Sequence, residues 1–404
     1  MTRKPSAWLG RSLIATVMPA LMALATAPMA SADEPVVSGI VSGTANAAAG
    51  AGISSPFVYG MEQYANIRLK ARAGDSGTVY AAVNLIAASG ANAAALAVAN
   101  PYSVGENYVA ALELERLYVS VRGERADVDF GLMRLAFGYG QAFRPSDFLN
   151  PPNPLVADAR PRGSLGAAIA AYPSWEGKAT GFVVAGKDPL AMDGEGLLCG
   201  TSIDAHFERA SVQGLYAYRT PDGERSMGVH RAGLSVKLEA TVGIVLDATY
   251  SLAPADGAGI EGLEAAIGVD YSLLDGKLYA LAQYLYNGPG MLDPDEDLTR
   301  LDAAILAGDA TGVYNRRNYA FVQAMYSIDD YTRAGLSCLA GIDDLSFSPA
   351  LSLEHEPFQG LTVTIVGRAA LDERTITGSG ERGELGPEHA GAYASVSATA
   401  KIRF

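Results

Sequence analysis

The amino-acid sequence predicts an all-β protein, and specifically a transmembrane antiparallel β-barrel of about 18 strands, with 16 also possible. Three observations carry this prediction. Segments of about ten residues alternate between apolar and polar side chains, short and long connections alternate between these segments, and the chain begins with the pattern of an export signal. A chain of 404 residues could otherwise hold two or three ordinary soluble domains.

Residues 1–32 have the three parts of a secretory signal peptide. The basic head, the apolar run and the small-residue cleavage site are, in order, Arg3, Lys4 and Arg11, residues 13–25, and Ala30, Ser31 and Ala32. The apolar run is shorter than the ~20 residues that a membrane-spanning helix needs, which disfavours a permanent anchor. We therefore expect cleavage before Asp33 and an exported chain, residues 33–404, that forms a single outer-membrane barrel.

Period-2 alternation identifies the candidate strands. In the stretch 59–72, for example, Tyr64, Asn66 and Arg68 share one face, and aliphatic residues occupy the other. The candidates are residues 36–45, 59–72, 79–85, 111–122, 127–138, 163–171, 178–187, 201–209, 211–219, 229–239, 242–251, 262–273, 277–287, 318–327, 332–342, 345–354, 361–370 and 389–404. Their length suits tilted strands that cross a bilayer.

The polar faces of these strands carry Arg and Lys side chains, which would each cost roughly 2–4 kcal/mol if they faced lipid at mid-depth. We therefore expect the polar faces to line a hydrated interior. In residues 111–122 the polar side chains move from odd-numbered to even-numbered positions between Glu115 and Arg116, which predicts a β-bulge.

The connections between candidate strands alternate between tight turns and longer segments over most of the chain. The exception is the "GIDD" stretch at residues 341–344, which is short where a long connection is expected. Short turns at one end and long loops at the other are typical of an outer-membrane barrel, whereas a soluble β-sandwich has no reason to segregate its loops. A barrel of this size leaves an aqueous channel rather than a packed core.

The chain ends in "ASVSATAKIRF", a stretch with one apolar and one polar face. We expect Ile402 and Phe404 to face lipid, and Lys401 and Arg403 to face the lumen. A last strand that ends in Phe resembles the signal that outer-membrane proteins present to the barrel-assembly machinery, and this resemblance implies that machinery as a partner. A chance aromatic residue at the end of an ordinary β-domain is the alternative.

Residues 139–162 form the least barrel-like connection and are the candidate for a loop that folds into the lumen. Gly138 and Gly140 permit a bend or a close backbone approach. Ser146 and Asp147, after Pro145, suit a short capped helical turn. The prolines that follow favour an extended and rigid path into the lumen; they are Pro151, Pro152 and Pro154.

The segment "LERLYVSVRGERADVDFGLMRLAFGYGQAFRPSDFLNPPNP" resembles a stretch of alginate-export-type and related porin-like outer-membrane barrels. The positions that match their pattern are Gly131, Arg134, Gly138, Phe143, Pro145, Asp147, Asn150 and Pro151. The resemblance covers about a tenth of the chain and implies a porin-like barrel in the bacterial outer membrane.

Charged residues near this loop are the candidate solute-binding site. They are Arg134, Arg144, Asp147, Arg160 and Arg162 in the loop region, and Glu113, Glu115 and Arg116 on a neighbouring strand. Cations on one wall and anions on the other would create a transverse field that orients polar solutes. Charge pairing that merely satisfies a hydrated interior is the alternative reading.

The sequence favours no enzymatic, metal-binding or nucleic-acid-binding function. Its four histidines lack metal-ligand spacing, and a Gly-x-Ser-x-Gly elbow is absent. The formal net charge of −14 gives no basis for nucleic-acid binding, which needs clustered Lys and Arg. The two cysteines, Cys199 and Cys338, do not form a disulfide framework, and the sequence leaves open whether they pair.

The sequence therefore predicts a porin-like channel for passive diffusion of small polar or charged solutes, surrounded by outer-membrane lipid and without a cofactor. The alternative is a surface protein, in which the barrel anchors long extracellular loops that bind a partner. The loops that would serve that function are residues 87–108 and 288–317.

Overall fold

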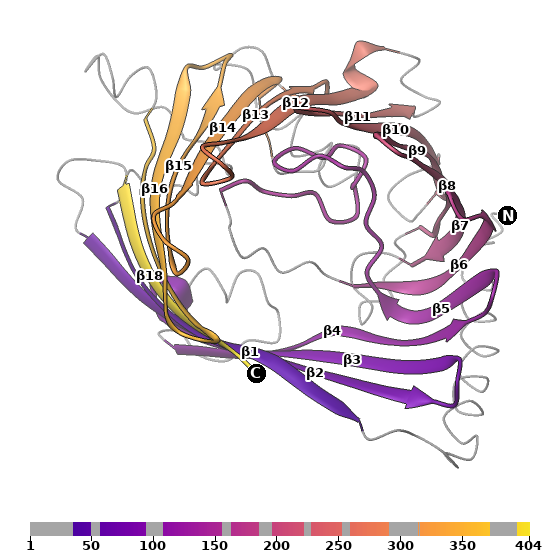
Figure 1. Ribbon diagram of the computed structural model, residues 1–404, viewed down its shortest axis with the longest axis horizontal. Helices are drawn as coiled ribbons and strands as arrows, with labels where there is room; N and C mark the ends of the chain where they lie inside the picture. The colour runs from indigo at the N-terminus through magenta and orange to yellow at the C-terminus, as the bar shows by residue number, and fades with distance from the viewer. Residues whose placement is uncertain are drawn as a thin grey trace, which may run out of the picture.

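The computed structural model describes residues 35–49, 57–93, 108–155, 163–185, 196–221, 228–252, 259–290, 314, 316–371 and 394–404. These residues form a closed barrel of 18 antiparallel strands, in which each strand pairs with its neighbours in sequence and β18 pairs with β1 (Figure 1). Closure leaves no sheet edge, so the strands satisfy one another's backbone hydrogen bonds. The predicted fold class is confirmed, with eighteen strands rather than sixteen.

The strands contain between 8 and 17 residues. They are β1 (Val36–Ala49), β2 (Phe57–Ala73), β3 (Gly77–Gly90), β4 (Tyr108–Arg122), β5 (Ala126–Met133), β6 (Ser164–Ser174), β7 (Gly177–Val184), β8 (Leu198–Phe207), β9 (Ala210–Arg219), β10 (Val229–Glu239), β11 (Gly243–Leu252), β12 (Leu263–Leu273), β13 (Leu278–Asn287), β14 (Asn318–Ser327), β15 (Thr332–Gly341), β16 (Ser346–Phe358), β17 (Leu361–Ala369) and β18 (Ala394–Arg403). A short 3-10 helix, η1 (Ile260–Gly262), precedes β12. Each predicted strand overlaps one of these.

The strands expose apolar side chains on their outer faces, and their inward faces carry polar or small side chains and, on some strands, larger buried apolar ones. On β12, Ile267 and Val269 are exposed, whereas Glu264 and Ala266 are buried. Exposed aromatic side chains lie near both ends of the barrel, as in the girdles of membrane barrels; among them are Tyr59, Tyr108 and Tyr216 at one end, and Phe207, Tyr331, Phe358 and Phe404 at the other. The outer surface therefore suits contact with lipid.

No helix in the described part of the chain is long and apolar enough to cross a membrane.

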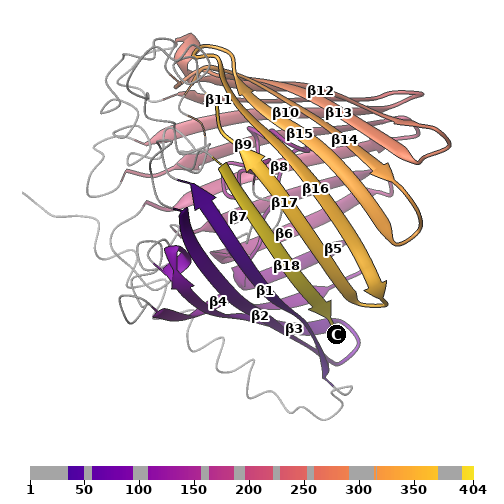
Figure 2. The same cartoon turned by 90° about the vertical axis from the view of Figure 1, so that its left-hand side faces the viewer.

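The short turns lie at one end of the barrel and the long connections at the other (Figure 2). The β15–β16 turn at residues 342–345 is short although it lies at the long-loop end. Its Asp343 accepts hydrogen bonds from the backbone N–H groups of Arg317, at 2.9 Å, and Asn318, at 2.7 Å. Asp344 pairs with Arg316 at 2.9 Å. The short turn thus holds the returning end of the β13–β14 connection.

The predicted β-bulge is confirmed between β3 and β4. Ala82 pairs with Arg116 and Val83 pairs with Leu114, so that Glu115 is the extra residue. The bulge turns both Glu115 and Arg116 away from the lipid face, and Glu115 is buried.

The β5–β6 connection, residues 134–163, is described at 134–155 and at Gly163; we call it the lumenal loop. The structure ends β5 at Met133, whereas the sequence pattern predicts a strand to residue 138. From there the chain runs inside the barrel, beneath β10–β13 in Figure 1. Residues 145–150 form successive turns rather than the predicted helical turn.

Candidate functional site

One aromatic side chain of the lumenal loop fixes it to strands β12–β15. Phe143 is only 1% exposed and belongs to a buried cluster with Leu281, Phe321 and Leu339. Its ring lies edge-on to Phe321, with 6.5 Å between centroids, and to Tyr314, at 5.4 Å. Burial of an aromatic side chain of this size contributes about 1.5–3 kcal/mol. Lumen-facing apolar residues of the wall are thereby removed from water.

A second pair of aromatic side chains fixes the loop to β6–β9. Phe137 and Phe148 stack with 5.9 Å between ring centroids, and Phe137 also contacts Phe182 of β7 at 5.2 Å. Both belong to a buried cluster that includes Leu198 and Leu215. The loop thus bridges two separate parts of the wall, so its middle section has a fixed position in the lumen.

Wall side chains satisfy the polar backbone of the loop where the loop lies against the barrel. Gln213 of β9 accepts a hydrogen bond from the Gly138 N–H at 2.6 Å. Gln283 of β13 accepts bonds from the N–H groups of Ala142, at 2.5 Å, and Phe143, at 3.2 Å. Two further bonds reach the last described residues before Gly163: Tyr314 donates to the Pro152 carbonyl at 3.1 Å, and Arg368 donates to the Leu155 carbonyl.

The structure brings five of the predicted site residues together at the start of the loop. Arg144 pairs with Asp147 at 3.2 Å, and Arg116 pairs with Glu115 at 3.3 Å. Arg134 is exposed and lies within electrostatic range of all four. With both carboxyl groups ionised, this charged cluster (Glu115, Arg116, Arg134, Arg144 and Asp147) carries one net positive charge.

The remaining predicted residues are not in this cluster. Glu113 accepts a weak hydrogen bond from Asn84 Nδ2 at 3.5 Å. Asn84 in turn accepts a bond from Asn66 at 2.6 Å, in a polar network on β2–β4 that also ties Asn66 to Glu115 at 2.7 Å. Arg160 and Arg162 lie outside the described residues.

Asp147 is the buried acid of the charged cluster, and it lies in the loop rather than in a membrane-spanning strand. Its side chain is fully buried. Burial raises the pKa of the Asp147 carboxyl to about 7, although the guanidinium groups of Arg144 and Arg134 and the backbone N–H groups of Asn150 and Phe137 lower it. The charge of the cluster therefore changes near neutral pH.

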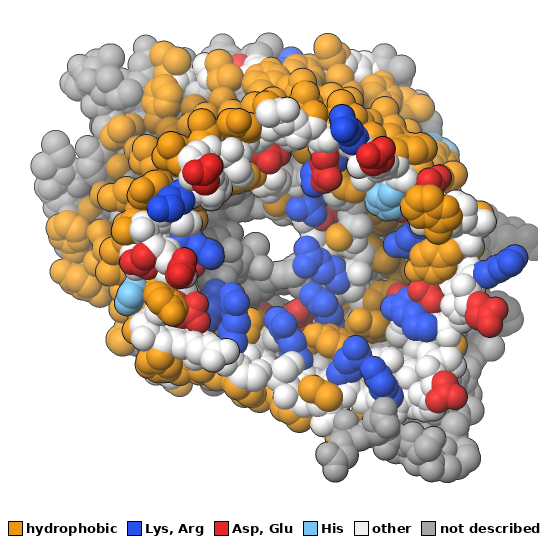
Figure 3. Space-filling model, viewed as in Figure 1, with side chains coloured by type: hydrophobic (Ala, Val, Ile, Leu, Met, Phe, Trp, Pro, Cys, Tyr) orange, Lys and Arg blue, Asp and Glu red, His pale blue; other side chains and the backbone are white. Residues whose placement is uncertain are grey.

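The loop narrows the lumen without filling the view along the barrel (Figure 3). Seen from the short-turn end, an opening remains beside the loop. Lys and Arg side chains gather in the lower half of this passage, towards β1–β5, and acidic side chains are frequent along its upper rim. This distribution has the two signs of charge that a transverse field requires.

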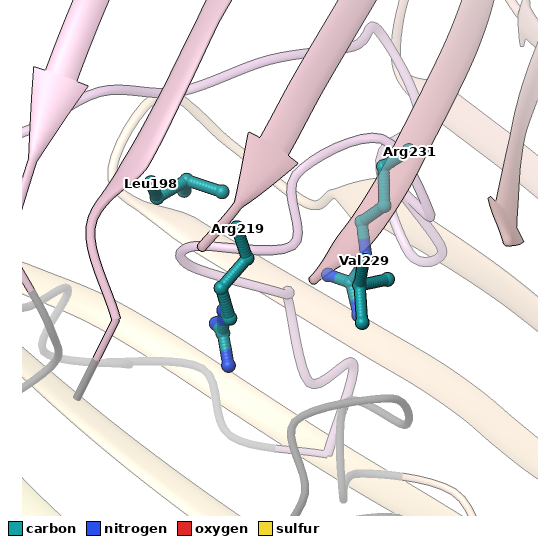
Figure 4. Close-up of a pocket in the computed structure, with 4 residues that line it drawn as sticks. All are labelled: Leu198, Arg219, Val229 and Arg231. Atoms are coloured by element: carbon teal, nitrogen blue, oxygen red, sulfur yellow. The ribbon is translucent and has the colours of Figure 1, made fainter. Parts of the chain in front are cut away.

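A small cleft lies at the long-loop end of β8–β10, lined by Leu198, Arg219, Val229 and Arg231 (Figure 4). Its volume is about 10 Å³, which is room for one water molecule at most. The Arg231 guanidinium lies 5.0 Å from the centre of the Phe148 ring. The cleft is therefore a packing feature of the loop rather than a solute site.

Sequence reasoning missed that side chains of the wall hold the loop; these side chains are Gln213, Ser235, Asp247 and Gln283. A signal for them exists on β13, where Leu281 and Leu285 share the lumenal face with Gln283. Leucines on the face of a strand that should line water indicate that another segment covers them. The sequence alone does not identify that segment.

The sequence matches no family model and no curated protein. Solved structures, in contrast, match over nearly the whole chain. OccAB1 of Acinetobacter baumannii is 10% identical with a TM-score of 0.57, covering 92% of this chain and 97% of that one. OccAB4 of the same organism is 9% identical with a TM-score of 0.56, covering 94% and 100%.

A third solved structure is OccK2 of Pseudomonas aeruginosa in complex with glucuronate, which is 8% identical with a TM-score of 0.56, covering 92% of this chain and 98% of that one. Identities this low establish similarity of fold. The chain therefore has the closed 18-stranded barrel fold of bacterial outer-membrane channels.

Proposed function

We propose that the protein is an outer-membrane, porin-like channel through which small polar or charged solutes diffuse passively. The observation that carries this proposal is a closed 18-stranded barrel with an apolar outer surface, narrowed by a rigid lumenal loop that leaves an opening beside it. An aqueous passage of this kind needs no moving part to admit a solute, and the loop limits the size of what passes.

We further propose that the passage prefers small anions. The charged cluster carries one net positive charge at the loop, and Arg134 is exposed to the lumen. A solute carboxylate near this cluster would be stabilised by Coulomb attraction, whereas a cation would be repelled. One structural neighbour was solved with glucuronate, a sugar carboxylate of the class that such a site would admit.

Three finer assignments belong to the same proposal. The resemblance of the loop segment to alginate-export-type barrels supports an outer-membrane channel of that general kind. The exposed Phe404, on the outer face of the last strand, suits recognition by the barrel-assembly machinery. Residues 1–32 would direct export and then be removed, as their pattern predicts.

Liposome swelling tests the proposal with three solutes of similar size: glucose, glucuronate and glucosamine. Vesicles containing the folded protein should swell in all three, with glucuronate entering about twofold faster than glucose and glucosamine more slowly. Equal rates would contradict the anion preference but not the channel. Absence of swelling in every solute, from a barrel whose folding is verified by heat-dependent gel mobility, would contradict the channel itself.

The surface-protein alternative depends on residues 87–108 and 288–317. Most of both segments lies outside the described residues. In the second segment, the described residue Tyr314 points into the barrel, where it contacts the lumenal loop.

A further inference from the structure

Asp247 of β11 is a lumen-facing carboxylate that the lumenal loop covers completely, so its side chain is 0% exposed. One of its oxygens, Oδ1, accepts hydrogen bonds from the backbone N–H of Ser146 at 2.8 Å and from the Ser146 hydroxyl at 2.6 Å. The other, Oδ2, accepts bonds from the Ser235 hydroxyl at 2.8 Å and from the Tyr139 N–H at 3.3 Å. Three of these four donors belong to the loop.

The backbone of the loop is shaped to reach this carboxylate. Gly138 has a φ of +77°, and a Cβ at this position would overlap Asp247 Oδ2 and the Ser146 hydroxyl. Ser235 of β10 adds a second link, because its hydroxyl accepts a bond from the Tyr139 N–H at 3.0 Å while it donates to Asp247. Residues from three parts of the chain therefore meet around one buried carboxylate.

We propose that Asp247 is a positioning residue that latches the middle of the lumenal loop to the wall and thereby sets the width and charge of the passage. This inference rests on the proposed channel function. Ser146 lies next to Asp147 and two residues from Arg144, so a bond to Ser146 fixes the two loop members that form the ion pair of the charged cluster. The latch contacts lie on either side of the Phe143 anchor and within the stretch bounded by Phe137 and Phe148, so the latch adds to the aromatic anchors.

The chemistry of the latch requires a carboxylate rather than an amide. An ionised carboxylate only accepts hydrogen bonds, and all four of its partners here donate. An asparagine at the same position would present its NH₂ group to one backbone N–H and one serine hydroxyl. The hydroxyl can rotate to accept a bond, but the N–H cannot, so one bond between the loop and the wall is replaced by a contact between two donors. Substitution to asparagine should therefore loosen the loop around Tyr139 and Ser146 even though the size and shape of the side chain are preserved.

Hydrogen exchange of Asp247→Asn tests the latch directly, whether or not the channel conducts. Amide protons of the peptide that contains Tyr139 and Ser146 should exchange about tenfold faster than in the wild type. Asp270→Asn is the matched control, because Asp270 faces the lumen from the neighbouring strand β12, and among the described residues it makes no hydrogen bond to the loop. It removes the same charge and should leave exchange unchanged.

Single-channel recording of the same variants gives the functional readout. Asp247→Asn should show larger mean conductance, by about twofold, and more frequent current fluctuations, whereas Asp270→Asn should keep the steady steps of the wild type. Ser146→Ala leaves the side chains of the wall intact and should raise both the amide exchange rate and the mean conductance, but less than Asp247→Asn. This variant replaces Asp247→Asn in the test if Asp247→Asn fails to fold.

The outcomes separate the two proposals. Equal protection of the loop in wild type, Asp247→Asn and Ser146→Ala would overturn the latch. Faster exchange in these variants, combined with a wild-type barrel that does not conduct, would support the latch and overturn the channel.

Discussion

At the scale of single residues, the exposed Arg134 is the side chain of the charged cluster that a passing ion meets most directly. A unit charge about 8 Å from an ion in a water-like medium changes its energy by about 0.5 kcal/mol. Screening by salt over about one Debye length reduces this change to about 0.2 kcal/mol. Because anion and cation shift in opposite directions, replacement of Arg134 by Gln should lower the ratio of anion to cation permeability by about twofold. The reversal potential in a salt gradient measures this ratio.

Arg333→Gln is the matched control for this prediction. Arg333 is also an exposed lumenal arginine, but it lies beside the short-turn end and is 3.8 Å from Glu354. Replacement of Arg333 should change the ratio of anion to cation permeability clearly less than replacement of Arg134 does. An equal shift from the two variants would mean that selectivity does not reside at the loop.

Asp147 gives the passage a predicted pH dependence. Because the pKa of its carboxyl is raised to about 7, the group is mostly charged at pH 8 and mostly neutral at pH 6. Protonation removes one negative charge, so the cluster gains one positive charge as pH falls, and anion preference should rise by about twofold.

Reversal potentials measured between pH 6 and pH 8 test this dependence. Asp147→Asn should show the low-pH selectivity of the wild type throughout this range. A wild type with constant selectivity, or a variant that titrates in the same way, would show that another group is responsible.

At the scale of elements, the seam between β1 and β18 depends on a glycine beneath the terminal aromatic ring. Gly39 and Phe404 exchange two backbone hydrogen bonds, at 2.8 and 3.1 Å. A Cβ on Gly39 would lie 2.5 Å from the Asn66 carbonyl oxygen and 2.7 Å from Phe404 Cζ. The first of these neighbours is backbone of β2 and has little freedom to move.

Substitution of Gly39 by Val should therefore destabilise the barrel by roughly 1–3 kcal/mol through overpacking at the seam. Heat-dependent gel mobility should show a lower melting temperature and a smaller folded fraction. Gly43→Val is the control on the same strand, since a Cβ there meets nothing within 4 Å. Similar melting temperatures for the two variants would refute this account of the seam.

The strands could be predicted from the sequence because alternation is a local property that each strand carries by itself. The end of β5 could not, because Leu135 and Phe137 keep a period-2 apolar spacing after the chain has left the wall, although on the phase of Asp127 and Asp129 rather than that of Val128. Phe137 packs inside the lumen rather than against lipid. The role of Asp247 was equally hidden, since it depends on Ser146, 101 residues away in the chain. Contacts of this kind follow from the path of the loop across the closed barrel.

At the scale of the whole molecule, one closed sheet has an outer face that suits lipid, two ends with different connections, and a lumen. The outer face suits lipid, the short turns and long connections lie at opposite ends, and the lumen holds the charges that could not face lipid. An acidic chain can still have a net positive cluster at its narrow section, because the loop places arginines there. The formal net charge of the whole chain therefore says little about whether the passage prefers anions or cations.

Single-channel current of the purified protein in a planar bilayer, with its reversal potential in a potassium chloride gradient, tests the central claim most directly. The structure predicts discrete, long-lived conductance steps and a reversal potential of the sign that chloride preference produces. A verified folded barrel without conductance steps would contradict the claim, because the lumenal loop would then close the passage rather than narrow it.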